Sequence, residues 1–222
     1  PAINEKELQE TFSGLTINVI RLDYNKGIVN ALNLGLDKLK RRNNVKYIAR
    51  LDAGDICDQH RFTKQINFLN AHTDVALLAS WARFENSSTG RGYDYITQVT
   101  HAKILKEMHF KCSFIHPSVI FRAEVLNIIG VYPEDFPHAE DYAFFWQILK
   151  SYEGAVLPEK LVQIMYTDKN VSAKHYKVQL QSRKKVVRQF GSSWLHKMIG
   201  ITILNLKIAL PQKLIIMLKN AY

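Results

Sequence analysis

The order of hydrophobic patterns in the first third of the chain constrains the fold most. Short apolar runs typical of strands occupy Ile17–Leu22, Tyr47–Leu51 and Val75–Ser80. Between them, residues 28–39 carry apolar side chains at helical spacing, and residues 61–70 also favour a helix. Because strands that alternate with helices usually form crossover units, this order predicts an α/β fold with a mostly parallel sheet flanked by helices.

The remaining segments predict further elements in a less regular order. We expect helices at Ile3–Phe12, His101–Phe110 and Glu140–Tyr152, and a strand at Ser118–Phe121. Ala155–Met165 could supply two short strands around Pro158. The polar, glycine-containing run Glu85–Tyr95 predicts a loop or a hairpin.

Charge divides the chain into two unequal parts. The whole sequence has 30 Lys and Arg against 20 Asp and Glu, a net charge of +10, but residues 169–222 hold 11 of these cations and no acid. We therefore predict a nearly neutral body in residues 1–168 and a basic, amphipathic, helical tail in residues 169–222. Within the tail, Lys174–Phe190 predicts a very basic helix, and Trp194–Ala221 is apolar with spaced lysines.

The tail suits an anionic membrane surface, although two alternatives stay open. No apolar run in it reaches the roughly 20 residues of a spanning helix. Apolar faces with lysines spaced along them are typical of helices that lie on an anionic bilayer. The alternative is a helix packed on the body or on a second copy in a homo-oligomer. Nucleic-acid binding is disfavoured, because charge alone suggests it and no recognised motif accompanies the charge.

The two cysteines indicate neither a zinc site nor a disulfide framework. Cys57 and Cys112 stand alone, outside any metal-ligand spacing. We expect free thiols and a reducing compartment.

Asp52 and Asp55 are the first candidate site residues. Asp52 follows the apolar strand that ends at Leu51, and Asp55 comes three residues later, after Gly54. Ligands of open α/β sheets bind beyond the carboxyl ends of strands. Acids at this place could hold a divalent cation that neutralises a diphosphate. The alternative is that Asp52 caps the following helix.

A second acidic pair and a histidine complete the candidates. Glu140 and Asp141 open a predicted helix, where a carboxylate could act as a general base or simply favour the helix dipole. His116 precedes Pro117 and could bind substrate or have a structural role. No dinucleotide fingerprint, P-loop or nucleophile elbow occurs.

Taken in order, these segments resemble the family 2 glycosyltransferases, which are inverting enzymes of the GT-A fold. The resemblance covers about residues 17–170. It rests on an ordered set of motifs, each weak alone: Asn25-Lys26-Gly27 with Ala31-Leu32-Asn33-Leu34-Gly35, Tyr47 to Ile56 (YIARLDAGDI), Arg61-Phe62 with Gln65, His116-Pro117-Ser118 with Phe121-Arg122, Gly130-Val131-Tyr132, and Glu140-Asp141-Tyr142.

The resemblance implies a role for each candidate residue. Asp141 would be the general base with Glu140 beside it, and His116 would contact the acceptor. Asp52 and Asp55 would hold Mg²⁺ or Mn²⁺ and the donor diphosphate. The remaining residues near the nucleotide-sugar donor would be Asn25, Gly27, Asn33 and Arg50, together with Asp52.

The implied activity is transfer of a sugar, with inversion, to a saccharide or lipid-linked acceptor. By analogy with the family, the product would be cell-surface polysaccharide or lipopolysaccharide. The protein would then be cytoplasmic and peripheral on the inner face of a bacterial cell membrane.

Two departures from the family pattern qualify this expectation. Gly54 stands where the family usually has a further acid, which puts one metal ligand in doubt. The family's first segment, about 40–50 residues, precedes the part that resembles this chain. The domain would then be N-terminally incomplete, with weak donor binding and an exposed sheet edge. The alternative function is therefore a catalytically inactive GT-A-fold remnant or binding module.

Overall fold

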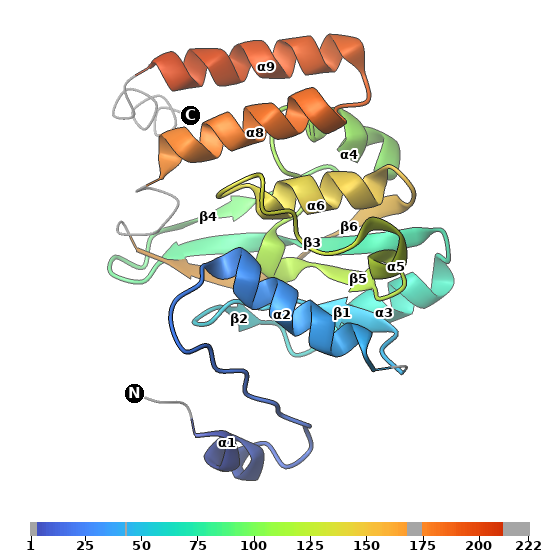
Figure 1. Ribbon diagram of the computed structural model, residues 1–222, viewed down its shortest axis with the longest axis vertical. Helices are drawn as coiled ribbons and strands as arrows, with labels where there is room; N and C mark the ends of the chain where they lie inside the picture. The colour runs from blue at the N-terminus through green and yellow to red at the C-terminus, as the bar shows by residue number, and fades with distance from the viewer. Residues whose placement is uncertain (1–3, 43, 168–174, 211–222) are drawn as a thin grey trace.

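A mixed six-stranded sheet carries helices on both of its faces (Figure 1). The computed structural model describes residues 4–42, 44–167 and 175–210. The elements along the chain are α1 (Glu5–Thr11), α2 (Ile28–Lys40), β1 (Tyr47–Ala49), β2 (Ile56–Cys57), α3 (Arg61–Ala71), β3 (Val75–Asn86), β4 (Gly92–Tyr95), α4 (His101–Glu107), the 3₁₀ turn η1 (His116–Ser118), β5 (Ile120–Arg122), α5 (Val125–Ile129), α6 (Glu140–Leu149), β6 (Glu153–Tyr166), α8 (Tyr176–Phe190) and α9 (Trp194–Ala209).

The α/β class with flanking helices is confirmed, but the sheet is less parallel than expected. Its order is β1-β5-β3-β6-β2, with β4 paired to β3 outside this path. Among the described strands, β3 and β6 form the one parallel pair, and the other four pairings are antiparallel. The hairpin expected as one option for Glu85–Tyr95 explains part of this, because β4 returns beside β3 through a tight turn.

The strand expected at Ile17–Leu22 is absent. These residues run extended toward α2 without a strand partner in the described sheet (Figure 1). Side chains of α1 take the place of a neighbouring strand, since Gln9 Oε1 accepts from the Ile17 amide at 3.0 Å and Glu5 Oε1 accepts from the Val19 amide at 3.0 Å. The segment is extended, as its apolar pattern suggests, but no strand of the described residues lies where it could pair with it.

The segment around Pro158 forms one long strand instead of two short ones. β6 pairs with β3 from Val75 to Asn86, and the register shifts between Ser80 and Ala82. On β6, this shift falls between Leu157 and Val162, so the residue without an amide hydrogen lies at an irregularity of the ladder. The expectation of two short strands was therefore wrong, because the ladder continues past Pro158 with a shift in register.

Two hydrophobic layers enclose the sheet. On one face, α2, α5 and α6 pack on sheet residues such as Leu77 and Phe121 in the main core. On the other face, Leu69 of α3 packs on Val75 and Leu78. The neighbours Leu77 and Leu78 of β3 thus point to opposite layers, which is the two-residue period of a strand covered on both sides.

Helix α8 packs on the body rather than lying apart from it. Its residues Leu180, Val186 and Val187 belong to the main core, and the Phe190 ring lies 5.8 Å from the Phe136 ring. Helix α9 runs beside α8 on the outer side (Figure 1). The division at residue 168 stays a prediction, and Lys174 and residues 211–221 of the expected tail lie outside the described residues.

Helix α9 approaches the body at a glycine. A Cβ atom on Gly200 would lie 2.2 Å from the His109 carbonyl oxygen, so no larger residue fits at this crossing without a shift. Ser193 caps the helix start by accepting from the His196 amide. None of the helices in the described ranges is long and apolar enough to cross a membrane.

Candidate functional site

A cavity of about 710 Å³ brings together five of the residues singled out from the sequence. They are Asp52, Asp55, His116, Glu140 and Asp141. They come from the segment after β1, from η1 and from the start of α6, which meet beside β3 and β6. Asp52 thus lines one space with His116 and Asp141, which lie 64 and 89 positions further along the chain.

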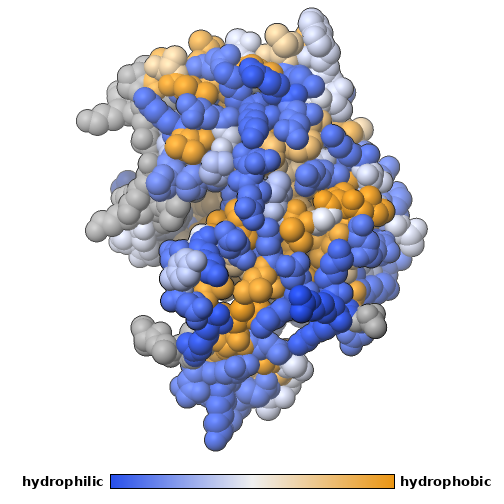
Figure 2. Space-filling model, viewed as in Figure 1, coloured by the Kyte–Doolittle hydropathy of each residue, from blue (hydrophilic) through white to orange (hydrophobic). Residues whose placement is uncertain are grey.

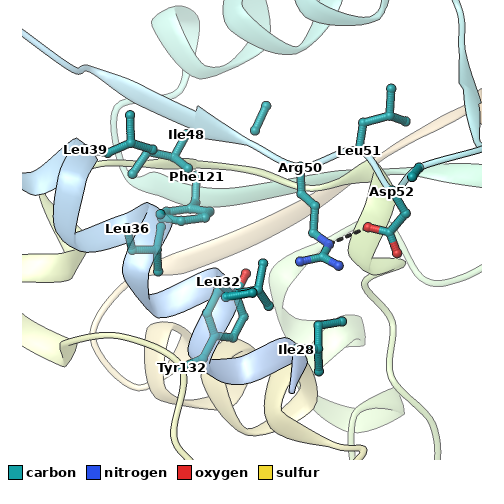
Figure 3. Close-up of a pocket in the computed structure, with 14 residues that line it drawn as sticks. Ile28, Leu32, Leu36, Leu39, Ile48, Arg50, Leu51, Asp52, Phe121 and Tyr132 are labelled. Atoms are coloured by element: carbon teal, nitrogen blue, oxygen red, sulfur yellow. Dashed lines mark hydrogen bonds and ion pairs between the residues drawn. The ribbon is translucent and has the colours of Figure 1, made fainter. Parts of the chain in front are cut away.

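A second, apolar cavity of about 580 Å³ adjoins the first. It lies between α2 and β1, where Leu32, Leu36, Ile48 and Phe121 form its walls (Figure 3). Asp52 borders both cavities, as do Ile28 and Ala53. Within the described sheet, β1 is an edge strand, so this cavity lies at the sheet's open side.

The polar end of the second cavity is an ion pair. Arg50 Nε lies 2.6 Å from Asp52 Oδ1, and Figure 3 shows both side chains at the mouth between β1 and α2. Asp52 is therefore held by its own strand's arginine rather than capping α3, whose N-cap is His60. The charge of Arg50 also lowers the pKa of His116 and opposes the rise in the pKa of Asp141.

The four-residue spacing of Arg61 and Gln65 has a structural explanation. The fully buried Arg61 donates from Nη2 to the Arg50 carbonyl at 2.8 Å and from Nε to Gln65 Oε1 at 3.1 Å. Gln65 in turn donates to the Ser118 carbonyl at 2.8 Å. These two α3 side chains thus fix the end of β1 against the turn that carries His116.

Only one of the two carboxylate oxygens of Asp55 has a hydrogen-bond partner in the described structure. Its Oδ1 accepts from the Met165 amide at 3.1 Å, while Oδ2 is buried without a hydrogen-bond partner in the described structure. Burial raises the pKa of this carboxyl group, and nearby Asp52 adds to the rise. Gly54, at φ +91°, shapes the turn that brings both acids to the cavity.

These acids could supply part of a metal site. Asp52 and Asp55 border the same cavity, and carboxylate oxygens suit Mg²⁺ and Mn²⁺. No group of three or more potential metal-ligating side chains occurs in the described part of the chain. The protein would therefore provide two carboxylates, and a diphosphate and water would have to provide the remaining ligands.

Asp141 is the strongest candidate for a base. Its side chain is 30% exposed, and its Oδ1 accepts from the Tyr142 amide at 2.7 Å. Burial raises its pKa to about 6, and the neighbouring charge of Glu140 contributes to that rise. A carboxyl group with this pKa is ionised near neutral pH and is more basic than an ordinary aspartate.

Glu140 lies beside Asp141 but is more deeply buried. Its Oε2 has no hydrogen-bond partner among the described residues, and burial raises its pKa. Two adjacent carboxyl groups in one cavity disfavour each other's ionisation.

His116 lies between Tyr132 and Asp141. Its Nε2 is 2.9 Å from the Tyr132 hydroxyl, and its Nδ1 is 3.9 Å from Asp141 Oδ2. Burial holds the pKa of His116 well below its usual range, with Arg50 adding to the effect. The imidazole is therefore neutral at physiological pH and oriented by Tyr132.

The three α2-side residues expected near the donor, which are Asn25, Gly27 and Asn33, have different environments. Asn25 accepts from the Gly27 amide at 2.9 Å in an exposed turn, and Gly27 begins α2 at φ +84°. Asn33 instead exchanges two 2.9 Å hydrogen bonds with the backbone of Tyr132. Because its side-chain oxygen and nitrogen both form hydrogen bonds, Asn33 connects α2 to the loop that contains Tyr132. Its predicted donor contact is untested.

No motif in the sequence predicts the contribution of α8 to the large cavity. Gln179 lines the large cavity and donates to the His138 carbonyl at 3.1 Å. His138 has a left-handed backbone, φ +64°, and its ring stacks on His175 at 4.4 Å. This helix therefore supports the turn that precedes Glu140 and Asp141. This support is visible only in the packing of α8 on α6, which lies far from α8 in the sequence.

The two cysteines carry free thiols, as expected. Cys112 lines the large cavity, where burial raises its pKa, and Cys57 lies on β2.

Solved structures with the same architecture identify the fold as GT-A-like. The chain is similar to Staphylococcus aureus TarS 1–349 in complex with UDP, with a TM-score of 0.58, 16% identity, and coverage of 90% of this chain and 57% of that one. It is also similar to the mannosyltransferase PcManGT from Pyrobaculum calidifontis in complex with GDP-Man and Mn²⁺, with a TM-score of 0.57, 13% identity, and coverage of 91% and 55%.

The chain belongs to glycosyl transferase family 2, whose model matches residues 2–127. A Haemophilus influenzae protein described as an uncharacterized glycosyltransferase is 29% identical over 84% of this chain and 59% of its own length. The amylovoran biosynthesis glycosyltransferase AmsE of Erwinia amylovora is 28% identical over 80% of this chain and 67% of its own. The chain thus spans about three fifths to two thirds of these relatives.

Proposed function

We propose that this protein transfers a sugar from a nucleotide-sugar donor to a saccharide or lipid-linked acceptor, with inversion at the anomeric carbon. The observation that carries the proposal is the single cavity shared by Asp141 and the acids after β1. A base and a place for a diphosphate must face the same reacting carbon in a direct displacement. Family membership supports the reaction class.

Asp141 is the base in this proposal. The acceptor hydroxyl gives its proton to the Asp141 carboxylate while its oxygen bonds to the anomeric carbon. The bond between that carbon and the diphosphate oxygen breaks on the opposite side, and the nucleoside diphosphate leaves. His116, neutral and 3.9 Å from Asp141, orients the carboxylate or the acceptor without competing for the proton.

The donor lies across the border between the two cavities in this proposal. The nucleoside would occupy the apolar space along α2 and β1, and the diphosphate would reach Asp52 and Asp55. Arg50 adds a positive charge at the same border. Mg²⁺ or Mn²⁺ held by the two aspartates would neutralise the leaving diphosphate. The Mn²⁺ and GDP-Man printed for one structural neighbour support this assignment by analogy.

A lipid-linked acceptor and a membrane surface fit the outer helices. An Escherichia coli relative, 29% identical over 68% of this chain and 52% of its own length, is named a UDP-Gal:alpha-D-GlcNAc-diphosphoundecaprenol beta-1,3-galactosyltransferase. Helix α9 exposes Trp194, Leu195 and Met198, and residues 169–222 contain no acid. Figure 2 shows hydrophobic groups over the upper helices, among hydrophilic ones. We propose that this face rests on the cytoplasmic side of an anionic membrane.

Calorimetry and a transfer assay test the proposal together. UDP-galactose and GDP-mannose are titrated into the protein with and without Mn²⁺, and release of UDP or GDP is measured with lipid-linked and free saccharide acceptors. We expect binding of a donor that strengthens with Mn²⁺, and acceptor-dependent release. Donor binding without release would favour the binding-module alternative. Absence of both, also in a version extended at its N-terminus with a family segment, would contradict the proposal.

A further inference from the structure

Four aromatic side chains form a continuous strip that leads out of the large cavity. They are Phe84 on β3, Tyr93 and Tyr95 on β4, and Tyr166 at the end of β6, and we call them the aromatic strip. Phe84 and Tyr95 line the cavity that also contains Asp141. The Phe84 and Tyr93 rings lie parallel, 5.1 Å apart, and Tyr166 is 6.3 Å from Tyr93.

The pairing of the strands places these rings on one face of the hairpin. Phe84 lies opposite Tyr93, and Ala82 lies opposite Tyr95 in the β3–β4 register. Because side chains alternate across a strand, all of these residues point to the cavity side. Tyr95 is further fixed by its hydroxyl, which donates to the Cys112 carbonyl at 3.1 Å.

The opposite face of the same hairpin is charged. Arg83 Nη1 lies 3.2 Å from Asp94 Oδ1, and Lys160 Nζ lies 2.9 Å from Asp94 Oδ2. The aromatic surface is thus confined to the side that continues into the cavity. Tyr93, at its outer end, is 52% exposed. An exposed aromatic patch continuous with a polar cavity is typical of a ligand-binding surface.

The chemistry of the strip favours a sugar ring over a lipid chain. A pyranose presents C–H bonds on its faces and hydroxyl groups around its edge. The C–H face can pack on an aromatic ring while the hydroxyls remain hydrated or reach polar groups. The strip contains only tyrosines and a phenylalanine, whereas the exposed face of α9 combines Trp194 with aliphatic side chains and lysines.

We propose that Tyr93, with Phe84 and Tyr95, forms a stacking subsite for the saccharide unit adjacent to the one that receives the transferred sugar. The inference rests on the proposed glycosyl transfer, since it assigns the cavity end of the strip to the reacting acceptor unit. It predicts a preference for acceptors of at least two sugar units. It also makes the β3–β4 hairpin a determinant of acceptor specificity.

Saturation-transfer NMR on the full chain tests binding without requiring catalysis. The probes are lactose, cellobiose, maltose and chitobiose, with the corresponding methyl monosaccharides for comparison. We expect at least one disaccharide to receive saturation through its C–H face protons. Tyr93→Ala should weaken its binding about 2- to 10-fold, and Tyr93→Phe should retain it. Phe12→Ala removes a similarly exposed ring, 49%, outside both cavities and is the matched control.

Three results would overturn the subsite: no saturation of any probe, equal binding by Tyr93→Ala and the unsubstituted protein, or an equal loss in Phe12→Ala. Displacement of the disaccharide by UMP would reassign the strip to a nucleobase and overturn it as well. Donor calorimetry on the Tyr93→Ala protein separates this inference from the proposed function. Normal donor binding and transfer with unchanged disaccharide affinity would remove the subsite alone, whereas saccharide binding without donor binding would remove the transferase proposal alone.

Discussion

The large cavity buries polar atoms, whereas helix α9 exposes apolar side chains. In the cavity, carboxyl oxygens of Asp55 and Glu140 are buried without hydrogen-bond partners among the described residues. On α9, Trp194 is 75% exposed and Leu195 is 58% exposed. Both arrangements cost folding free energy, the first through desolvated charge and the second through hydrated apolar surface. A cation or polar ligand would relieve the first cost, and an apolar surface would relieve the second.

The substitution Asp141→Asn should have the largest effect and separates function from stability. We expect transfer to fall by about 10²–10⁴-fold, because the base is lost while the Tyr142 amide keeps its acceptor. The folded-state pKa of Asp141 is raised, so its ionisation destabilises the fold above that pKa. At pH 7.5 the variant should therefore be more stable, by about 1 kcal/mol, and this gain should vanish below the unfolded-state pKa near 4.

Steady-state kinetics and thermal unfolding at pH 7.5 and pH 3.5 measure both effects. Asp135→Asn is the control, because it removes an exposed carboxylate from the loop before α6. Unchanged transfer by Asp141→Asn would exclude the base role. A loss of activity accompanied by a lower unfolding temperature at pH 7.5 would attribute the effect to misfolding.

The substitution Trp194→Ala tests whether the exposed apolar surface of α9 contacts a membrane. If α9 lies on a bilayer, removing this ring should weaken partition into vesicles of 30 mol% phosphatidylglycerol in phosphatidylcholine by about tenfold. Binding should also weaken with salt, because the neighbouring lysines contribute electrostatically. Flotation across a salt series provides the measurement.

Val178→Ala, a change at an exposed apolar residue of α8, is the control for loss of any surface side chain. Equal flotation of the unsubstituted and Trp194→Ala proteins would exclude α9 as the bilayer contact. A DNA shift assay under the same conditions should show no specific binding.

The substitution Gln179→Ala tests whether α8 belongs functionally to the cavity. It removes the hydrogen bond to the left-handed His138 and should lower kcat by about 3- to 10-fold while donor affinity stays unchanged. Gln181→Ala, an exposed residue of the same helix, should have no effect. A parallel change in donor affinity would mean that the helix acts through general stability. Kinetics and donor calorimetry distinguish these results.

The smallest expected effect is on the acidic limb of the pH profile. Transfer should decline as pH falls through about 6, where Asp141 becomes protonated. Because the charge of Glu140 contributes to the raised pKa, Glu140→Gln should move this limb down by about 0.5 pH unit. Initial rates between pH 5 and pH 8 would show the movement, and an upward shift would contradict the assignment.

The sequence was most informative where a short motif and a strand end coincide. Asp52 and Asp55 follow a strand, and the Glu140–Asp141 pair opens a helix. The family resemblance predicts one site for these four acids, and all four line one cavity. The motif residues Asn33 and Arg61 make backbone contacts that a motif alone does not reveal, and the donor contact of Asn33 stays a prediction.

The features that the sequence analysis predicted wrongly or did not predict depend on partners far away in the chain. An apolar run such as Ile17–Leu22 becomes a strand only where another strand is available, and side chains of α1 hold it instead. Gln179 lies in a helix whose composition suggested only surface charge, and its place in the cavity depends on how α8 crosses α6. Local periodicity contains neither kind of information.

The paired hydrogen bonds between Asn33 and the Tyr132 backbone join the two cavities mechanically. Helix α2 forms a wall of the apolar cavity, and the Tyr132 hydroxyl orients His116 beside Asp141 in the other. The position of α2 at one cavity is therefore coupled, through the Tyr132 loop, to the orientation of the His116 imidazole in the other.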